Sequence, residues 1–344
     1  MKPMGVAVIG AGYWGPNLIR NVQQASGFEL RWVCDLDRDR ARRAAGPHCA
    51  NVTDSLDDVL ADPEVEAVAI ATPAATHAEV ALACLESDRH VLTEKPLALS
   101  VAEGEKLVAL AAQRGRVLMC DHTYCYTPAV RRIREWIHGG ELGGIQYFDS
   151  VRINLGLVQS DVDVFWDLAP HDLSILDFVL PEGCSPEAVS AHGADPLGAG
   201  QACIGYLTMP LTDGGIAHIN VNWLSPTKVR RTIIGGSRRI VVWDDLDPAQ
   251  RLSMYDKGVD LRAPMEGEAL RRALISYRVG DMVAPALPEV EALQLVVQEF
   301  LAAVREARPP LTDGRAGLRV LRILEAASRS LDRRGAAVRI GTLQ

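Results

Sequence analysis

Short apolar runs alternate with amphipathic helical segments over the first 122 residues of the chain. The apolar runs that read as strands are Val6–Ile9, Leu30–Cys34, Ala67–Ala71, His90–Thr93 and Val117–Cys120. Segments with helical spacing of apolar residues lie between them, at Asp54–Leu60, Ala78–Leu85 and Ala102–Ala112. Wholly apolar strands joined by helices are typical of a parallel sheet covered on both faces. The pattern therefore predicts a doubly wound α/β domain with a ligand crevice at the carboxyl ends of its strands.

The pattern changes after Asp121. A helix is predicted from Pro128 to His138, a strand over Gln146–Ile153, and a second helix that begins at Pro170. Alternating segments then follow one another at Ala202–Thr208, Ile216–Trp223, Arg230–Ile234 and Ile240–Trp243. Consecutive strands of this kind indicate an α+β domain with a large, mostly antiparallel open sheet. Two late helices, at Glu289–Ala307 and Arg315–Leu331, could pack on either domain.

Length and composition support two domains and narrow the range of partners. A chain of 344 residues is long for one core, and we expect domains over residues 1–122 and 123–344. A hydrophobic fraction of 48% and a charged fraction of 23% are typical of a globular enzyme. The net charge of −8 argues against nucleic acid as a partner. No apolar run approaches ~18 residues, and the first residues do not resemble a signal peptide. We therefore expect no membrane association and a cytoplasmic location.

The seven cysteines indicate neither a disulfide framework nor a metal site. Their number is odd and no pair has CxxC spacing. Several fall inside apolar, strand-like runs, so reduced and buried thiols are the simplest interpretation. The spacing of cysteines and histidines gives no support for a zinc site.

A glycine-rich turn follows the first predicted strand. Gly10, Gly12 and Gly15 form a GxGxxG pattern directly after that strand. In a Rossmann domain the first glycine allows the tight turn, the second lets the backbone approach a pyrophosphate, and the third lets helix and strand pack closely. The next helix would direct its free N–H groups at the phosphates. We expect this loop, with Tyr13 and Trp14 inside it, to bind a dinucleotide.

Asp35 indicates which dinucleotide is bound. It lies 20 residues after Gly15, at the end of the second predicted strand. A carboxylate there accepts hydrogen bonds from both hydroxyls of the adenosine ribose and repels a 2′-phosphate, so we expect NAD as the cofactor. Arg38, three residues later, leaves NADP open.

Two further loops follow predicted parallel strands and so should lie at the same edge of the sheet. The first is Thr72–His77, in which Thr72, Pro73 and His77 are candidates for contact with the nicotinamide half of the cofactor. An equally good interpretation is a helix start with Thr76 as N-cap. The second is Glu94-Lys95-Pro96, where Glu94 and Lys95 would face the cofactor and Lys95 the substrate.

A candidate acid/base group lies in the second domain, in the segment Phe165–Asp172. Pro170 fits the first position of a helix, which would place Asp167 and His171 at the helix entrance. A histidine is the natural proton acceptor when an alcohol loses hydride to NAD⁺. The alternative is that Asp167 or His171 merely caps the helix.

Taken together, GxGxxG, Glu94-Lys95-Pro96 and the pair Asp167 and His171 resemble the glucose–fructose oxidoreductase/inositol dehydrogenase/MocA family over nearly the whole chain. The resemblance implies that Lys95, Asp167 and His171 form the catalytic group, without a metal. It also implies an NAD-dependent dehydrogenase or reductase that acts on CH–OH groups.

The segments Tyr13–Leu18, Arg152–Gly156 and Trp166–Ser174 are similar to the branch of that family with sugar and UDP-sugar 3-dehydrogenases. This similarity implies oxidation of a sugar or nucleotide sugar at C3. The substrate contacts then expected are Lys95, Tyr124, Arg152, Asn154, Trp166, Asp167 and His171. The alternative for Arg152 and Asn154 is a solvated or ion-paired surface position, and for Tyr124 it is simple packing. Open alternatives are an inositol-type cyclitol dehydrogenase, a keto-deoxysugar reductase and a non-catalytic sensor of NAD and sugar.

The run Gly215–Trp223 predicts an oligomer. Ala217, Ile219, Val221 and Trp223 alternate with a second set of residues that is mostly polar. The apolar set should be covered by helices. In the family that the chain resembles, open sheet faces pack together across a two-fold axis, which implies a homodimer or homotetramer.

Overall fold

The computed structural model describes residues 2–48, 51–156, 158–159, 162–261 and 275–341. Within these residues the chain divides into two compact units. The first unit comprises residues up to 127 together with 289–325, and the second comprises 128–288 and 326 onward. The second predicted domain began at residue 123, whereas residues 123–127 and 289–325 belong to the first unit.

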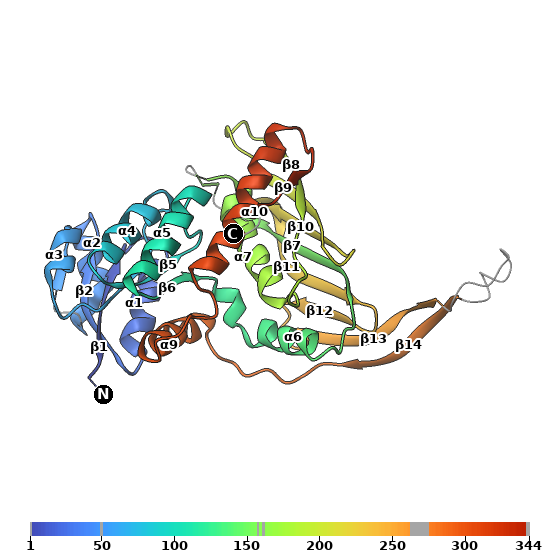
Figure 1. Cartoon of the computed structure of the whole chain (residues 1–344), viewed down its shortest axis with the longest axis horizontal. Helices are drawn as coiled ribbons and strands as arrows, with labels where there is room; N and C mark the ends of the chain where they lie inside the picture. The colour runs from blue at the N-terminus through green and yellow to red at the C-terminus, as the bar shows by residue number, and fades with distance from the viewer. Residues whose placement is uncertain (1, 49–50, 157, 160–161, 262–274, 342–344) are drawn as a thin grey trace. The chain divides into compact units, whose positions relative to one another are not determined.

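The first unit is built on six parallel strands in the order β3-β2-β1-β4-β5-β6 (Figure 1). The strands are β1 (Met4–Ile9), β2 (Phe28–Cys34), β3 (Asn51–Thr53), β4 (Ala67–Ile70), β5 (His90–Glu94) and β6 (Leu118–Asp121). The α-helices between them are α1 (Gly15–Gln24), α2 (Arg38–Ala45), α3 (Leu56–Ala61), α4 (His77–Glu86) and α5 (Val101–Arg114). Short 3₁₀ turns are η1 (Gly46–His48), η2 (Ala74–Thr76) and η3 (Thr123–Tyr126). The strand order reverses between β1 and β4, which creates a crevice at their carboxyl ends.

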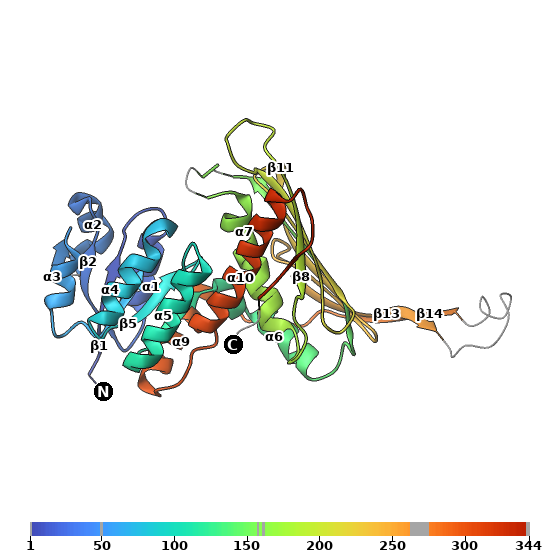
Figure 2. The same ribbon diagram turned by 45° about the horizontal axis from the view of Figure 1, so that its top comes forward.

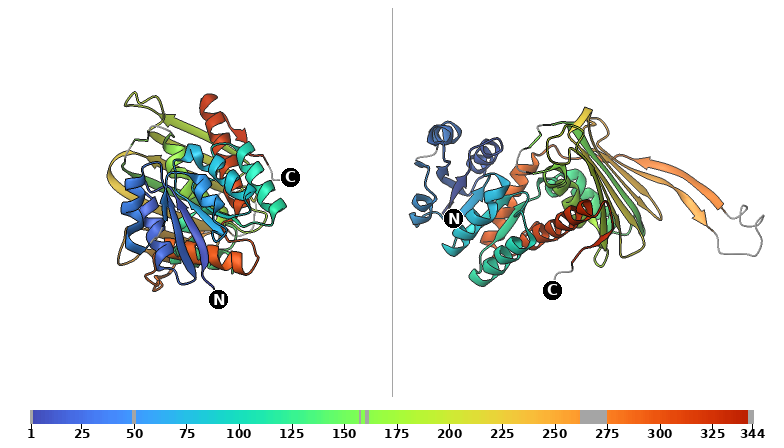
Figure 3. Two further views of the ribbon diagram at one scale, coloured as in Figure 1. Left: turned by 90° about the vertical axis from the view of Figure 1, so that its left-hand side faces the viewer. Right: turned by 90° about the horizontal axis from the view of Figure 1, so that it is seen from above.

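Helices cover both faces of this sheet, as the left view of Figure 3 shows. Helix α4 contacts α5, and α1 contacts α2 and the late helix α9 (Ala292–Arg305). All residues of β1, β4 and β6 are buried, which explains why these strands read as continuous apolar runs. The predicted parallel α/β fold is confirmed.

The segment that brings α9 into the first unit is held by specific contacts. Glu291 accepts hydrogen bonds from Arg20 at 2.7 and 2.9 Å and from Asn21 at 3.0 Å. Phe300 stacks on Phe28 with ring centroids 6.5 Å apart. Thr312 bonds the main-chain carbonyl of Cys120 at the end of β6. These long-range contacts place α9 in the first unit, a choice that the sequence pattern left open.

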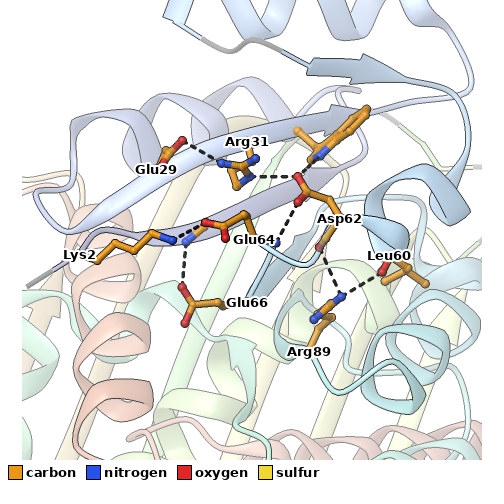
Figure 4. A network of polar contacts seen from close by, with 10 residues as sticks. Lys2, Glu29, Arg31, Leu60, Asp62, Glu64, Glu66 and Arg89 are labelled. Carbon is orange, nitrogen blue, oxygen red and sulfur yellow. Dashed lines mark hydrogen bonds and ion pairs between the residues drawn. The ribbon is translucent and has the colours of Figure 1, made fainter.

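Charged residues cluster at the amino edge of the sheet, away from the crevice (Figure 4). Arg31 bonds Asp62 at 3.0 Å and Glu29 at 3.1 Å, and Lys2 pairs with Glu64. Ligands of doubly wound sheets bind at the carboxyl ends of the strands. The pair of Lys2 and Glu64, with side-chain exposures of 70% and 48%, contributes little stability. Arg31 and Asp62 are more covered, at 24% and 13%.

The second unit contains a sheet in the order β14-β13-β12-β11-β7-β10-β9-β8-β15. The strands are β7 (Ile145–Leu155), β8 (Ala188–Ala194), β9 (Ile204–Pro210), β10 (Ile216–Asn222), β11 (Leu224–Gly236), β12 (Ile240–Asp244), β13 (Leu252–Leu261), β14 (Ile275–Val283) and β15 (Val338–Arg339). Among the strand pairs described here only β7 and β10 run parallel. The predicted mostly antiparallel sheet is confirmed, and β13 and β14, which form a ribbon at its edge, were not anticipated.

Helices α6 (Pro128–His138), α7 (Val164–Val179) and the end of α10 (Gly314–Asp332) lie against one face of this sheet (Figure 2). Ala217, Ile219, Val221 and Trp223 are at most 1% exposed, and α7 contacts β10. On the opposite face Ile216 is 48% exposed. The predicted division of β10 into a covered face and a half-polar face is therefore confirmed.

The prediction that a helix begins at Pro170 is wrong. Helix α7 begins at Val164, and the Asp163 side chain caps it by accepting hydrogen bonds from the N–H groups of Phe165 at 2.9 Å and Trp166 at 3.0 Å. Pro170 lies inside the helix, where it lacks the N–H that would bond one turn back. Asp163 was the cap signal that the sequence offered, because an aspartate there precedes the first buried helical residues.

Six of the seven cysteines lie in the described residues and are free thiols, whereas Cys49 lies outside them. Burial raises the pKa of Cys34 to about 11 and that of Cys84 to about 12, so both are protonated near neutral pH. The described ranges contain no group of three His, Cys, Asp or Glu side chains suited to a metal ion. None of the helices in these ranges has the length and apolar character needed to cross a bilayer.

Candidate cofactor and catalytic residues

The glycine loop between β1 and α1 has the geometry that a pyrophosphate cradle needs. Gly10 has φ +96°, and a Cβ there would lie 2.6 Å from the carbonyl group of Ala71. A Cβ on Gly15 would lie 2.2 Å from the carbonyl oxygen of Gly10. At Gly12 no heavy atom lies within 4 Å of such a Cβ, so its backbone faces open space. Gly10 and Gly15 therefore make the turn, and Gly12 leaves the backbone accessible to a ligand.

Large side chains flank this loop at the surface. Tyr13 is 90% exposed and Leu36, directly after β2, is 91% exposed. Trp14, at the N-cap of α1, is also exposed. Exposed apolar side chains beside an open glycine loop suit the apolar faces of a bound dinucleotide. Tyr13 and Trp14 thus remain candidates for cofactor contact.

Asp35 directly follows the last residue of β2, and its carboxylate is buried. Its Oδ2 accepts the N–H of Ala11 at 2.7 Å, and its Oδ1 accepts the N–H of Asp37 at 2.8 Å. The Arg40 guanidinium lies 2.6 Å from Oδ1. Burial alone would raise the pKa of Asp35, but the hydrogen bonds from Arg40, Ala11 and Asp37 outweigh it and lower the pKa. Asp35 is therefore an anion that joins the glycine loop to the second strand.

Arg40 is the arginine beside this carboxylate, and sequence reasoning missed it. The arginine considered from the sequence, Arg38, instead lies 3.5 Å from Asp54. Arg40 stands five residues after Asp35, on α2, and only the helical turn that Asp37 caps brings the two together. The cap was readable from the sequence, because Asp37 directly precedes the helical segment.

His77 lies beneath the cofactor loops and is 1% exposed. Its Nδ1 lies 2.7 Å from the carbonyl oxygen of Pro96, and its Nε2 lies 2.8 Å from that of Thr72. Because both ring nitrogens contact main-chain carbonyls, we expect His77 to support the Thr72 and Pro96 loops and not to contact the cofactor directly. Thr76 stands at the N-cap of α4 as the alternative proposed, but its side chain makes no capping hydrogen bond. Thr72 is partly accessible and Pro73 exposed, so both remain candidates.

Glu94-Lys95-Pro96 forms the carboxyl end of β5, with a cis peptide bond between Lys95 and Pro96. Glu94 is the register partner of Asp121 at the end of β6. Burial, and then the charge of Asp121, raises the pKa of Glu94 well above its usual range. Glu94 and Lys95 are both half-buried, although Oε1 of Glu94 is buried, and their contact with the cofactor stays a prediction.

Asp167 and His171 lie in the second unit, one turn apart on α7 and hence on one face of that helix. The indole N–H of Trp223 donates to Asp167 Oδ2 at 3.0 Å. His171 and Asp167 are both half-buried. The alternative that either residue caps the helix is wrong, because Asp163 holds that position. Trp223 was expected in the core; its contact with Asp167 depends on strand packing and has no local sequence signal.

Arg152 does not have the place that was expected for a substrate ligand. It is 3% exposed, and its Nε donates to Asp172 Oδ2 at 2.7 Å. A second hydrogen bond joins Arg152 to Asp172 Oδ1 at 3.2 Å, and Ser150 donates to the same oxygen at 2.7 Å. A buried, paired guanidinium has no surface left for a sugar. We therefore correct the expectation and assign Arg152 to the interior beneath α7.

The remaining candidates keep accessible surface. Asn154 is half-buried, and a Cβ on Gly156 would lie 2.9 Å from its Nδ2 and 3.2 Å from the Trp223 ring. Asn154 thus lies in the neighbourhood of the Trp223 side chain that holds Asp167. The indole N–H of Trp166 donates to Ser328 at 3.0 Å. Tyr124, in η3 of the first unit, is half-buried.

The sequence matches two related family descriptions. Residues 4–122 match an oxidoreductase family with an NAD-binding Rossmann fold, and residues 134–339 match the C-terminal alpha/beta domain of the same family. Among curated proteins, the UDP-N-acetylglucosamine 3-dehydrogenase of Acidithiobacillus ferrooxidans is 30% identical over 93% of this chain and 95% of its own length. The inositol 2-dehydrogenase 1 of Mycolicibacterium vanbaalenii is 35% identical over 56% of this chain and 60% of its own.

Solved structures agree with these matches. The UDP-N-acetylglucosamine 3-dehydrogenase GnnA from Acidithiobacillus ferrooxidans superposes with a TM-score of 0.79 at 27% identity, over 97% of this chain and 99% of that one. GenD2 from gentamicin A biosynthesis, in complex with NAD, gives a TM-score of 0.82 at 27% identity, over 99% and 97%. The chain is an oxidoreductase and belongs to the glucose–fructose oxidoreductase/inositol dehydrogenase/MocA family.

Proposed function

We propose that this oxidoreductase transfers hydride reversibly between NAD(H) and a secondary alcohol carbon of a sugar or nucleotide sugar, at C3. The observation that carries the proposal is the similarity to a UDP-N-acetylglucosamine 3-dehydrogenase over 93% of the chain. Lys95, Asp167 and His171, the residues that the family motifs require, are all present.

NAD(H) is the proposed cofactor, because the residues of the first unit fit it. Gly12 leaves an open backbone, and Asp35 presents an anion where the adenosine ribose would lie. When bound, the nicotinamide supplies the hydride acceptor or donor. A second negative charge on a 2′-phosphate would be repelled by Asp35, although Arg40 offsets part of that repulsion.

The residues of the chain would handle the proton. His171 would accept the proton of the reacting hydroxyl as general base and return it in the reverse direction. Lys95 would donate a hydrogen bond to the same oxygen and so polarise it. Asp167, held by the Trp223 indole, would fix the orientation of His171 or bind a neighbouring hydroxyl.

The test is NADH formation with a panel of UDP-sugars, free sugars and cyclitols. We expect the highest kcat/KM with a UDP-sugar. His171→Ala should lower kcat by about two to four orders of magnitude and leave NADH affinity nearly unchanged. Lys95→Ala should also lower kcat, and the two losses should not add fully, since both residues act on one oxygen. Near-normal turnover by His171→Ala would contradict the assignment.

The cofactor has its own test, which needs no substrate. Calorimetry should show tighter binding of NADH than of NADPH. Asp35→Ala should narrow the difference between the two affinities, because the charge that repels the 2′-phosphate is gone. Equal or tighter binding of NADPH by the unaltered protein would refute the preference. Arg38→Ala is the matched control, since Arg38 pairs with Asp54 instead of Asp35.

A second candidate is an inositol-type cyclitol dehydrogenase, which the identity of 35% to an inositol 2-dehydrogenase favours. The same three residues would serve it, and a keto-deoxysugar reductase would use them in reverse. A higher kcat/KM for myo-inositol than for any UDP-sugar would decide for the cyclitol. Binding of NADH and sugar without turnover would instead indicate a sensor.

A further inference from the structure

A half-buried and a buried carboxyl group end neighbouring strands of the first unit, and the half-buried one directly precedes Lys95. Glu94 and Asp121 end the neighbouring parallel strands β5 and β6 and are register partners. Asp121 is 1% exposed, and Oε1 of Glu94 and Oδ2 of Asp121 are both buried with no N–H donor from the described residues. Two ionised carboxylates are acceptors only, so they cannot hydrogen bond to each other. A proton on one of them makes that carboxyl group a donor, so that the two buried oxygens can form a hydrogen bond with each other.

We propose that Glu94 and Asp121 share one proton, with Glu94 the acid that donates to the Asp121 carboxylate, and that this singly charged pair positions Lys95. The proposal adds two positioning residues to the reaction and rests on the proposed function for the role of Lys95.

The hydrogen bonds around the pair assign the proton to Glu94. Asp121 Oδ1 accepts the Thr123 hydroxyl at 2.8 Å, a bond that favours the ionised form. Glu94 Oε2 receives only the main-chain N–H of Lys95, at 3.3 Å. Burial raises the pKa of both carboxyls, and the charge of Asp121 raises that of Glu94 further, whereas hydrogen bonds from Glu94 and Thr123 lower the pKa of Asp121. The negative charge therefore resides on Asp121.

The titratable groups with a charge interaction with the pair are Lys95, Cys120 and Tyr126. His122 follows Asp121 in the chain and feels the charges of Arg319 and Lys95. His122 is 2% exposed, and neither ring nitrogen has a hydrogen-bond partner among the described residues. Burial, followed by the charges of Arg319 and Lys95, lowers the pKa of His122 to about 3, so the ring is neutral. Burial also raises the pKa of Cys120 well above its usual range, so that thiol is neutral too. Asp121 thus carries the one negative charge of the pair, and Lys95 is the cation whose charge acts on Glu94.

This arrangement acts on Lys95 in two ways. The bond between Glu94 and Asp121 fixes the last residue of β5, so Lys95 leaves the strand in one direction. The remaining charge attracts the ammonium group without a second buried anion, which would have to be desolvated.

Substituting Glu94 and Asp121 one at a time distinguishes the positioning of Lys95 from simple packing. Glu94→Gln keeps the shape and still offers an N–H to Asp121, so kcat should fall by less than about threefold. Asp121→Asn removes the charge, and kcat should fall by about thirtyfold or more with NADH affinity retained. Equal losses of kcat in both variants would overturn the proposal.

Infrared spectroscopy tests the shared proton without any substrate. The NADH-bound protein should show the C=O band of a protonated carboxyl group at neutral pH, and Glu94→Gln should lose it. Glu64→Gln is the control, since Glu64 pairs with Lys2 at the opposite edge of the sheet (Figure 4). Absence of the band in the unaltered protein refutes the proposal even if Asp121→Asn fails to fold. Lack of turnover on every sugar, with the band present, would instead count against the proposed function.

Discussion

Asp172 and Arg152 form a buried ion pair between α7 and β7 of the second unit. Removing it tests how strongly this contact stabilises the position of α7. The side chains of Arg152 and Asp172 are 4% and 2% exposed. Asp172 accepts two hydrogen bonds from Arg152 and one from Ser150, whose hydroxyl also lies 3.1 Å from that of Thr232. Asp172→Ala removes the anion that the buried Arg152 guanidinium contacts.

Breaking one side of such a pair costs about 3–5 kcal/mol, most of it the penalty for the charge left behind. Removing both charges with Arg152→Met and Asp172→Leu avoids that penalty, and we expect a loss within about 2 kcal/mol of the unaltered protein. The exposed pair of Arg239 and Glu141 has the same 2.7 Å distance, with side-chain exposures of 38% and 43%. Glu141→Ala, the matched control, should cost about 0–1 kcal/mol.

Urea unfolding at neutral pH measures these differences, with the m-value checked for a change in the unfolding reaction. The double variant also tests the correction made for Arg152. If the residue is structural, KM for the sugar should stay within about threefold in the double variant. A double variant as unstable as Asp172→Ala would refute the electrostatic argument. A rise in KM of about tenfold or more would restore Arg152 as a substrate ligand.

Three further outcomes are expected. His77→Ala should lower kcat by about tenfold, and His77→Gln by less because it keeps one carbonyl contact; equal losses in steady-state kinetics would contradict this. Burial, then the charge of Arg116, lowers the pKa of His90 from 6.5 to about 4. The unfolded chain therefore takes up this proton first, so stability should be full above pH 6.5 and fall between pH 6.5 and about 4, with a smaller fall in His90→Asn by urea unfolding. Light scattering at micromolar concentration should give a dimer or tetramer of the 37.3 kDa chain through the half-polar face of β10, and a monomer mass would contradict it.

Local patterns carried most of the fold prediction. Strands β1 and β4 are continuous apolar runs because both faces of their sheet are covered, and β10 alternates because one of its faces is not. The GxGxxG turn could be interpreted residue by residue, because Gly10 and Gly15 occupy positions with no room for a Cβ. These features depend on neighbours close in sequence or on a single sheet face.

What the sequence could not reveal depends on partners far along the chain. Arg152 was expected to be a substrate contact because its segment is similar to the 3-dehydrogenase branch, and only the packing of α7 on β7 brings Asp172 to it. Helix α9 returns to the first unit through contacts such as Glu291 with Arg20, 271 residues apart. In both cases a tertiary contact decided between two locally acceptable structures. Pro170 suggested a helix start, and the Asp163 cap, a local contact with Phe165 and Trp166, overrode that preference.

The helix that carries the proposed acid/base residue is fixed to its own unit at three points. Asp172 joins it to β7 through Arg152, Asp167 joins it to the Trp223 indole, and Trp166 joins it to Ser328 on α10. The first of these lies one position after His171 and the second one turn before it. Side chains held at both ends of a turn restrict the rotation and translation of that turn, which is what precise placement of an acid/base group requires. These contacts also explain how α7 tolerates a proline in its interior, because tertiary bonds replace the stability that the missing backbone bond removes.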